Sequence, residues 1–238
     1  MSSISIPTAM ETKRIVSAAQ RRTALVAGVF YILTFVSIPT LFLYGAVKSA
    51  NYIVGPGPDT AVIIGGILEV IVALAGIGTA VVLYPVVKRQ NEGAALGFVG
   101  SRVLEAAGIL AGVACLLAIV SLRQAGVGAG ALVIGQTLAV MYNRIFLLSQ
   151  SLMPIVNDLL LGFLLYRSRL VPRVLPVIAF IGAPLLIASD LGVLFNLWGQ
   201  TSSLTALLAL PVAIFEFSLG VYLIVKGFRP SPILSSDR

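Results

Sequence analysis

Acidic side chains inside apolar stretches are the first residues of this sequence that could carry chemistry. The sequence has nine acidic residues, and five of them lie in runs long enough to cross a bilayer. One arginine lies in such a run as well. A charged group at the centre of a membrane span costs roughly 2.5–3.5 kcal/mol on insertion scales, so each needs a partner or a task. The candidate buried polar site consists of Glu69, Arg102, Glu105, Asp158, Asp190 and Glu216.

The spacing of these residues predicts which of them meet. Arg102 and Glu105 are three residues apart, which makes them neighbours on one helix face. At a rise of 1.5 Å per residue, Arg102, Asp158 and Glu216 lie roughly 12–14 Å from the same end of their spans, and Glu105 lies slightly deeper. Glu69 and Asp190 lie roughly 12 Å from the opposite end. We expect Arg102, Glu105 and Glu216 to form the centre of the site.

Five carboxylates that share one guanidinium in a low dielectric cannot all ionise without a large desolvation cost, so some are expected to carry a proton. The functional interpretation is a shared-proton network or a binding site for a cation. The competing interpretation is that the carboxyl groups only join helices, with hydrogen bonds of about 0.6 kcal/mol each.

Small residues share a helix face with three of the acids. Membrane helices approach one another along such faces, so these acids should point into the bundle and away from lipid. The three faces are Gly65, Glu69, Ala73, Gly76 and Ala80; Gly97, Ser101, Glu105, Gly108 and Gly112; and Ala209, Ala213, Glu216 and Gly220.

Several classes of function lack their residues here. The sequence has no histidine and a single cysteine, Cys115, which excludes His-ligated metals, Ser-His or Cys-His catalysis and an intrachain disulfide. It shows no clustered Asp motif for a divalent metal and no Gly-rich phosphate loop. We therefore expect no catalytic residues, no metal, no cofactor and no enzymatic activity. The net charge of +7 comes from short basic clusters between apolar runs, not from one basic face, so nucleic acid is not expected as a partner.

The composition predicts an all-α, polytopic membrane bundle. Hydrophobic residues make up 58% of the chain and charged residues 11%, where soluble domains carry about 25%. Gly55-Pro56-Gly57-Pro58 ends the first span, and Pro39 is expected to kink it. We read 131–144 as a short interfacial or lipid-edge helix, and the alternative that it is part of the fourth span stays open. The predicted division is a polar tail at 1–22, six spans at 23–47, 61–87, 94–120, 145–166, 172–198 and 204–225, and a tail at 226–238.

Basic residues predict the orientation. Twelve of the 16 Lys and Arg residues fall on one side of the six-span layout, three on the other, and Arg102 lies within a span. Loops rich in Lys and Arg stay cytoplasmic, so both termini are expected in the cytoplasm. The membrane is expected to be the cell membrane, that is, the plasma or inner membrane. The twelve are Lys13, Arg14, Arg21, Arg22, Lys88, Arg89, Arg167, Arg169, Arg173, Lys226, Arg229 and Arg238, and the three are Lys48, Arg123 and Arg144.

Around these residues the sequence resembles the bacterial membrane proteins grouped as the domain-of-unknown-function 4386 family. The similar segments are Leu68-Glu69, LYPVVKR at 83–89, GFVGSRVLEA at 97–106, YRSRLVPR at 166–173, EFSLG at 216–220 and VKGF at 225–228. The resemblance covers about residues 20 to 228 and implies a multi-pass helical protein. It supplies no activity and no substrate.

Two functions stay open at this point. The first is a small proton- or cation-coupled transport protein that uses the buried acids as a relay or cation site. The second is a non-catalytic membrane subunit or regulator whose small-residue faces dock a partner. Besides the lipid bilayer, a protein partner or a homo-oligomer therefore stays open.

Overall fold

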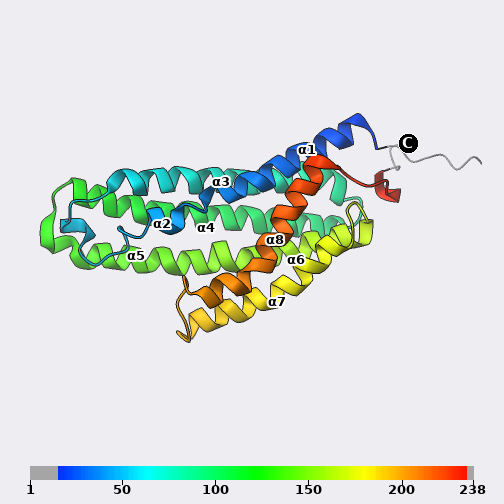
Figure 1. The fold of residues 1–238 in the computed structure, drawn as a ribbon. Coiled ribbons are helices and arrows are strands. Elements are labelled where there is room, and N and C mark those ends of the chain that lie inside the picture. Colours follow the sequence, from blue (N-terminus) through cyan, green and yellow to red (C-terminus); the bar gives the residue numbers. More distant parts are fainter. Residues whose placement is uncertain (1–15, 235–238) are drawn as a thin grey trace, which may run out of the picture.

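Long apolar helices account for nearly all of the chain that the structure, a computed structural model, describes, which is residues 16–234 (Figure 1). No strand occurs in that range, and six helical elements within it are long and apolar enough to cross a membrane. The predicted all-α bundle with six spans is confirmed. Its helices are α1 (Ala18–Leu33), α2 (Thr40–Leu43), α3 (Asp59–Val87), α4 (Glu92–Gln124), α5 (Leu132–Phe146), α6 (Leu152–Ser168), α7 (Val174–Leu194) and α8 (Ser203–Val225).

Polar side chains start three of these helices. Ser17 and Gln20 form a reciprocal capping box before α1. The Asn91 side chain accepts a hydrogen bond from the Ala94 amide at the start of α4, and Ser202 does the same for Thr205 at the start of α8. These caps satisfy amide groups that the first helical turn leaves without partners.

The first span is interrupted. After α1 the chain tightens into a 3-10 segment, η1 (Thr34–Ser37), and Pro39 precedes the short helix α2. The break thus begins five residues before the proline at which the sequence predicts a kink, where the Thr34 hydroxyl donates to the Tyr31 carbonyl over 2.7 Å. Pro39 has no amide hydrogen to donate, so the α-helical hydrogen-bond pattern cannot run through this position. The apolar span runs over 18–43, compared with the predicted 23–47.

Residues 131–144 do not form a separate interfacial helix, so this part of the prediction needs correction. Ala131 ends a 3-10 turn, η3 (Gly128–Ala131), and residues 132–144 belong to α5, which continues through a π-helical segment, η4 (Leu147–Ser151), directly into α6. The whole element covers Gly128–Ser168 and lies along α4, which at 33 residues is long enough to support both halves. Arg144 does not mark a boundary, because its side chain is exposed at the surface and leaves the helix uninterrupted.

The remaining spans differ from the predicted ones by a few residues at their ends. They close into a ring, because each helix packs on the next in the order α1, α3, α4, α6, α7, α8 and back to α1. Buried aromatic side chains, Tyr31, Phe98 and Phe215, fill its interior. The Arg102 side chain is buried inside the same ring.

The start of α1 and the segment after α8 lie at the same end of the bundle (Figure 1). The Arg21 guanidinium donates to the Leu223 and Ile224 carbonyls over 3.0 and 2.6 Å, which ties α1 to the end of α8. The Arg229 amide donates to the Leu170 carbonyl over 2.7 Å, and the Ser231 hydroxyl to the Ser168 carbonyl over 2.5 Å. The predicted tails extend into residues 1–15 and 235–238, which lie outside the described residues.

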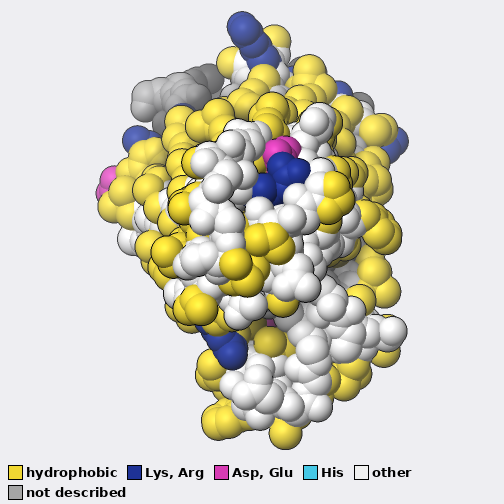
Figure 2. Space-filling model, turned by 90° about the vertical axis from the view of Figure 1, so that its left-hand side faces the viewer, with side chains coloured by type: hydrophobic (Ala, Val, Ile, Leu, Met, Phe, Trp, Pro, Cys, Tyr) yellow, Lys and Arg dark blue, Asp and Glu magenta, His cyan; other side chains and the backbone are white. Residues whose placement is uncertain are grey.

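The opposite end is held together by one ion pair. Arg123 at the end of α4 contacts Asp59 at the start of α3 over 2.6 Å, and Tyr52 donates to the same carboxylate over 2.7 Å. Burial and this hydrogen bond raise the pKa of the Tyr52 hydroxyl. Figure 2 looks onto this end, which carries few charged side chains, with a basic and an acidic group adjacent near its middle.

Candidate functional site

An ion-pair network around Arg102 lies inside the helix ring. Its guanidinium contacts Glu105 on the same helix over 3.0 Å and Glu216 on α8 over 2.6 Å. The Arg102 side chain is 2% exposed, and those of Glu105 and Glu216 are 10% and 13% exposed. Its Nε has no hydrogen-bond partner among the described residues. One buried guanidinium thus forms ion pairs with two carboxylates, one on its own helix α4 and one on α8.

Polar and aromatic neighbours hold this network in place. The Asn157 amide on α6 donates to Glu105 over 2.7 Å, and its oxygen accepts a hydrogen bond from Ser101 on α4. The Arg102 guanidinium donates to the Tyr31 hydroxyl over 3.5 Å and lies against the Tyr31 and Phe98 rings. Helices α1, α4, α6 and α8 therefore all contribute side chains to one buried site.

Asp158 belongs to this site without a hydrogen bond of its own. Its side chain is fully buried, and neither carboxyl oxygen has a partner among the described residues. It interacts electrostatically with Arg102, Glu105 and Glu216. If all four groups were ionised, three negative charges would face one positive charge in a low dielectric, which favours uptake of a proton or another cation.

The structure places Glu69 in a different cluster, on α3 facing the loop after α2. Tyr142 donates to Glu69 over 2.9 Å, and the Tyr44 ring meets the Tyr142 ring edge-on with centroids 5.5 Å apart. The Lys48 ammonium lies 4.5 Å from the centroid of the Tyr142 ring. Partial burial lowers the pKa of Lys48, and the nearby Glu69 opposes that shift. Gly65 is required here, because a Cβ at that position would lie 2.4 Å from the Tyr44 ring.

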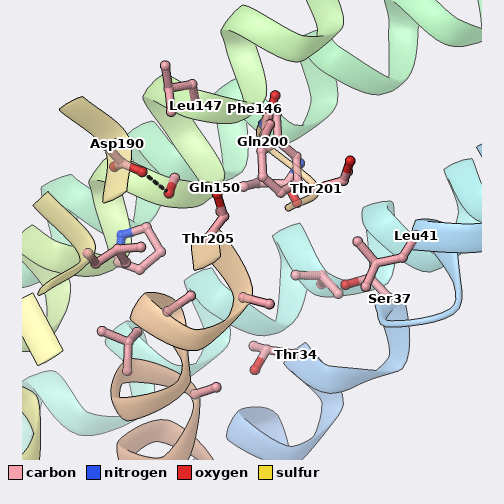
Figure 3. A pocket seen from close by; sticks show the side chains of 18 of the residues that line it. Thr34, Ser37, Leu41, Phe146, Leu147, Gln150, Asp190, Gln200, Thr201 and Thr205 are labelled. Carbon is pink, nitrogen blue, oxygen red and sulfur yellow. Dashed lines mark hydrogen bonds between the residues drawn. The ribbon is translucent and has the colours of Figure 1, made fainter. Parts of the chain in front are cut away.

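Asp190 is the remaining predicted residue, and it lies apart from the Arg102 network. Its Oδ1 accepts a hydrogen bond from the Ser151 hydroxyl over 2.5 Å, while its Oδ2 has no partner among the described residues (Figure 3). What connects Asp190 to Arg102 is a pocket that both side chains line.

This pocket has a volume of about 580 Å³ and extends from Arg102, Glu105 and Glu216 to Gln200 and Thr201 in the α7–α8 loop. Apolar side chains form much of its wall, and Figure 3 shows the hydroxyl and amide side chains that surround it between η1, η4 and α8. Its volume falls in the range of small-molecule sites, which is about 300–1,000 Å³.

The π-helical segment η4 shapes one side of the pocket. It contributes Gln150 and Ser151 to the lining, and Ser151 is the residue that holds Asp190. Segment η4 approaches α4 so closely that a Cβ at Gly108 would lie 2.2 Å from the Ser149 Cβ. Single π turns are rare inside α-helices and often occur at functional sites.

The sequence predicts the charged residues of this pocket, Arg102, Glu105, Asp190 and Glu216, but not its uncharged polar residues. Gln150, Ser151 and Thr205 are ordinary polar side chains near helix ends, and nothing in their spacing marks them. Tyr31 and Tyr142 carried a weak signal, because a tyrosine deep in a span needs a partner for its hydroxyl group. A glycine such as Gly108 signals close helix packing but does not identify the neighbour.

A sequence profile of the family described as "Domain of unknown function (DUF4386)" matches residues 26–227 of this chain. The match includes all six residues of the predicted site. No curated protein and no solved structure matches the chain.

Proposed function

This chain belongs to the DUF4386 family, and from that premise we propose that it is a small, non-enzymatic transport protein that couples a solute to proton movement. The observation that carries the proposal is the position of the Arg102 network at the inner end of the pocket. Glu105 and Glu216 both contact Arg102 and both line the pocket, so a cation or a proton that enters it reaches the ion pairs directly.

Competition for the guanidinium supplies a coupling mechanism. A solute cation in the pocket attracts Glu216 and repels the Arg102 guanidinium, which weakens the ion pair between them, and Arg102 then gains freedom to interact with Asp158. The buried Asp158, with no hydrogen-bond partner among the described residues, is the group we assign as the holder of the exchangeable proton. Buried ionisable groups inside membrane bundles form such relays in pumps and transporters.

Side-chain contacts between helices also stabilise their packing, so a loss of stability would not test the proposal. The test must therefore measure the movement of protons across a membrane. Purified protein would be reconstituted into liposomes that contain a pH-sensitive dye, and a potassium diffusion potential would drive proton entry. We expect faster acidification than in empty liposomes, and loss of most of that rate in Glu216→Gln.

The matched control is Glu92→Gln, which removes an exposed carboxylate at the start of α4, far along the helix from the pocket. Its rate should equal that of the unchanged protein. If proteoliposomes and empty liposomes acidify at the same rate, with and without added solute, the proposed function is wrong.

A further inference from the structure

We infer that the pocket binds an amphipathic organic cation, whose charged group is held by Asp190. The inference rests on the proposed function in one respect, since it names the class of solute for the same pocket. The lining, the entrance and the charge of the pocket each support it.

The wall of the pocket requires a ligand with a large apolar part. Its apolar lining comes from η1, η4 and every helix from α2 to α8. Burial of apolar ligand surface against such a wall contributes about 25 cal/mol per Å². Representative wall residues are Phe35, Val72, Ile109, Leu186 and Val193.

The entrance is apolar too. Leu41 and Phe42 on α2 line the pocket and are 64% and 84% exposed. Because α2 belongs to the first apolar span, these side chains face the region that lipid occupies. A ligand that partitions into the membrane surface would therefore meet an apolar edge leading into the pocket.

The charge of the pocket selects a cation. Its lining contains three carboxyl groups, Glu105, Asp190 and Glu216, and one cationic group, Arg102. The guanidinium already bonds Glu105 and Glu216, so a ligand anion would have to displace a carboxylate from it. Asp190 differs from these two carboxyl groups. Its Oδ2 has no partner among the described residues, and Ser151 holds its other oxygen in place.

Uncharged polar side chains lie to one side of Asp190, toward the middle of the pocket (Figure 3). Gln150, Gln200 and Thr205 contribute amide and hydroxyl oxygens to the same part of the pocket, and the partial negative charges of these oxygens favour a ligand cation. The arrangement gives the cationic group of a ligand one charged contact and several neutral ones, while the apolar remainder of the ligand lies toward α3, α4 and α7.

Two ions of the same shape and opposite charge test the inference: tetraphenylphosphonium and tetraphenylborate. Each would be measured in a separate equilibrium dialysis against the protein in neutral-lipid nanodiscs, with empty nanodiscs for background. We expect the cation to bind at least about tenfold more tightly than the anion. Asp190→Asn should weaken cation binding by about tenfold or more, and Glu92→Gln should leave it unchanged.

Ala209→Trp provides a second variant that alters no charge, because it fills the pocket from α8. It should weaken binding of tetraphenylphosphonium even where Asp190→Asn does not yield folded protein. Equal or tighter binding of the anion, or full cation affinity in Asp190→Asn, would overturn the inference. Cation binding without proton flux would contradict the proposed function alone, whereas proton flux without cation binding would contradict this inference alone.

Discussion

At the scale of single residues, Arg102 is the group on which the charge balance of the bundle depends. It is buried and contacts two carboxylates, so its removal leaves Glu105 and Glu216 without their cation. Breaking a buried ion pair from one side typically costs about 3–5 kcal/mol, whereas replacement of all partners by neutral groups costs much less. The loss of stability caused by removing Arg102 should therefore be reversed in part when its carboxylate partners are replaced by neutral side chains.

We predict that Arg102→Leu lowers the stability of the protein by about 3 kcal/mol or more, and that Arg102→Leu, Glu105→Gln, Glu216→Gln regains at least half of that loss. Thermal unfolding in detergent can be followed by labelling of Cys115, a buried free thiol. A lower pH should also stabilise Arg102→Leu, because protons that bind Glu105 and Glu216 can take the place of the lost cation. Losses that simply add, with no recovery in the triple variant, would show that the three side chains do not act together.

At the scale of elements, the π-helical segment η4 links two parts of the structure. It joins α5 to α6 without a break, and it directs Gln150 and Ser151 into the pocket. This geometry depends on a close approach to α4, where Gly108 leaves space for Ser149. The glycine in the small-residue face of α4 is thus a packing residue that determines the shape of the pocket.

Gly108→Ala and Gly100→Ala form a matched pair on α4. The first places a Cβ 2.2 Å from Ser149, and the second places it in open space. We predict that Gly108→Ala costs about 1–3 kcal/mol of stability by overpacking and weakens tetraphenylphosphonium binding, since η4 must move. Gly100→Ala should be neutral or up to about 1 kcal/mol stabilising, because alanine favours a helix over glycine. Similar melting temperatures for the two variants would mean that η4 tolerates displacement.

At the scale of the whole molecule, the ring of six spans brings the start of α1 and the segment after α8 to one end, and the pocket extends toward the other. Contacts of Arg21 with the end of α8 reinforce this arrangement. Of the 13 Lys and Arg residues that the structure describes, nine lie toward the end with the start of α1, and we therefore predict that this end faces the cytoplasm. In that orientation the α7–α8 loop and the outer part of the pocket face away from the cytoplasm.

Reporter fusions check this orientation. Fusions after Pro58 and Gly199 should be active only for a reporter that works outside the cytoplasm, and fusions after Gly93 and Arg169 only for one that works inside. The reason is the excess of basic residues at the second pair of loops. A cytoplasmic signal after Gly199 would reverse the side from which the pocket is reached.

The sequence alone determined the class of the protein, and it predicts the depth of the charged groups in the membrane. Apolar runs of sufficient length can satisfy their backbone only as helices in a bilayer, so the number of spans follows from hydropathy. The Arg102–Glu105 contact is also local, because a three-residue spacing fixes it. Distance from the span ends is likewise a property of the sequence, and it suffices to separate Glu69 and Asp190 from Arg102.

Only the tertiary structure decided which helices meet. Glu216 reaches Arg102 across 114 positions of sequence, and Ser151 reaches Asp190 across 39. Lipid-facing and buried faces of a membrane helix are both apolar, so hydrophobic periodicity does not reveal how each helix is rotated or which one lies beside it. For the same reason the sequence does not reveal that α5 continues through η4 into α6. An arginine such as Arg144 can face outward without ending the helix. The pocket exists because six helices close into a ring, and that order is set by side-chain packing between segments far apart in the chain.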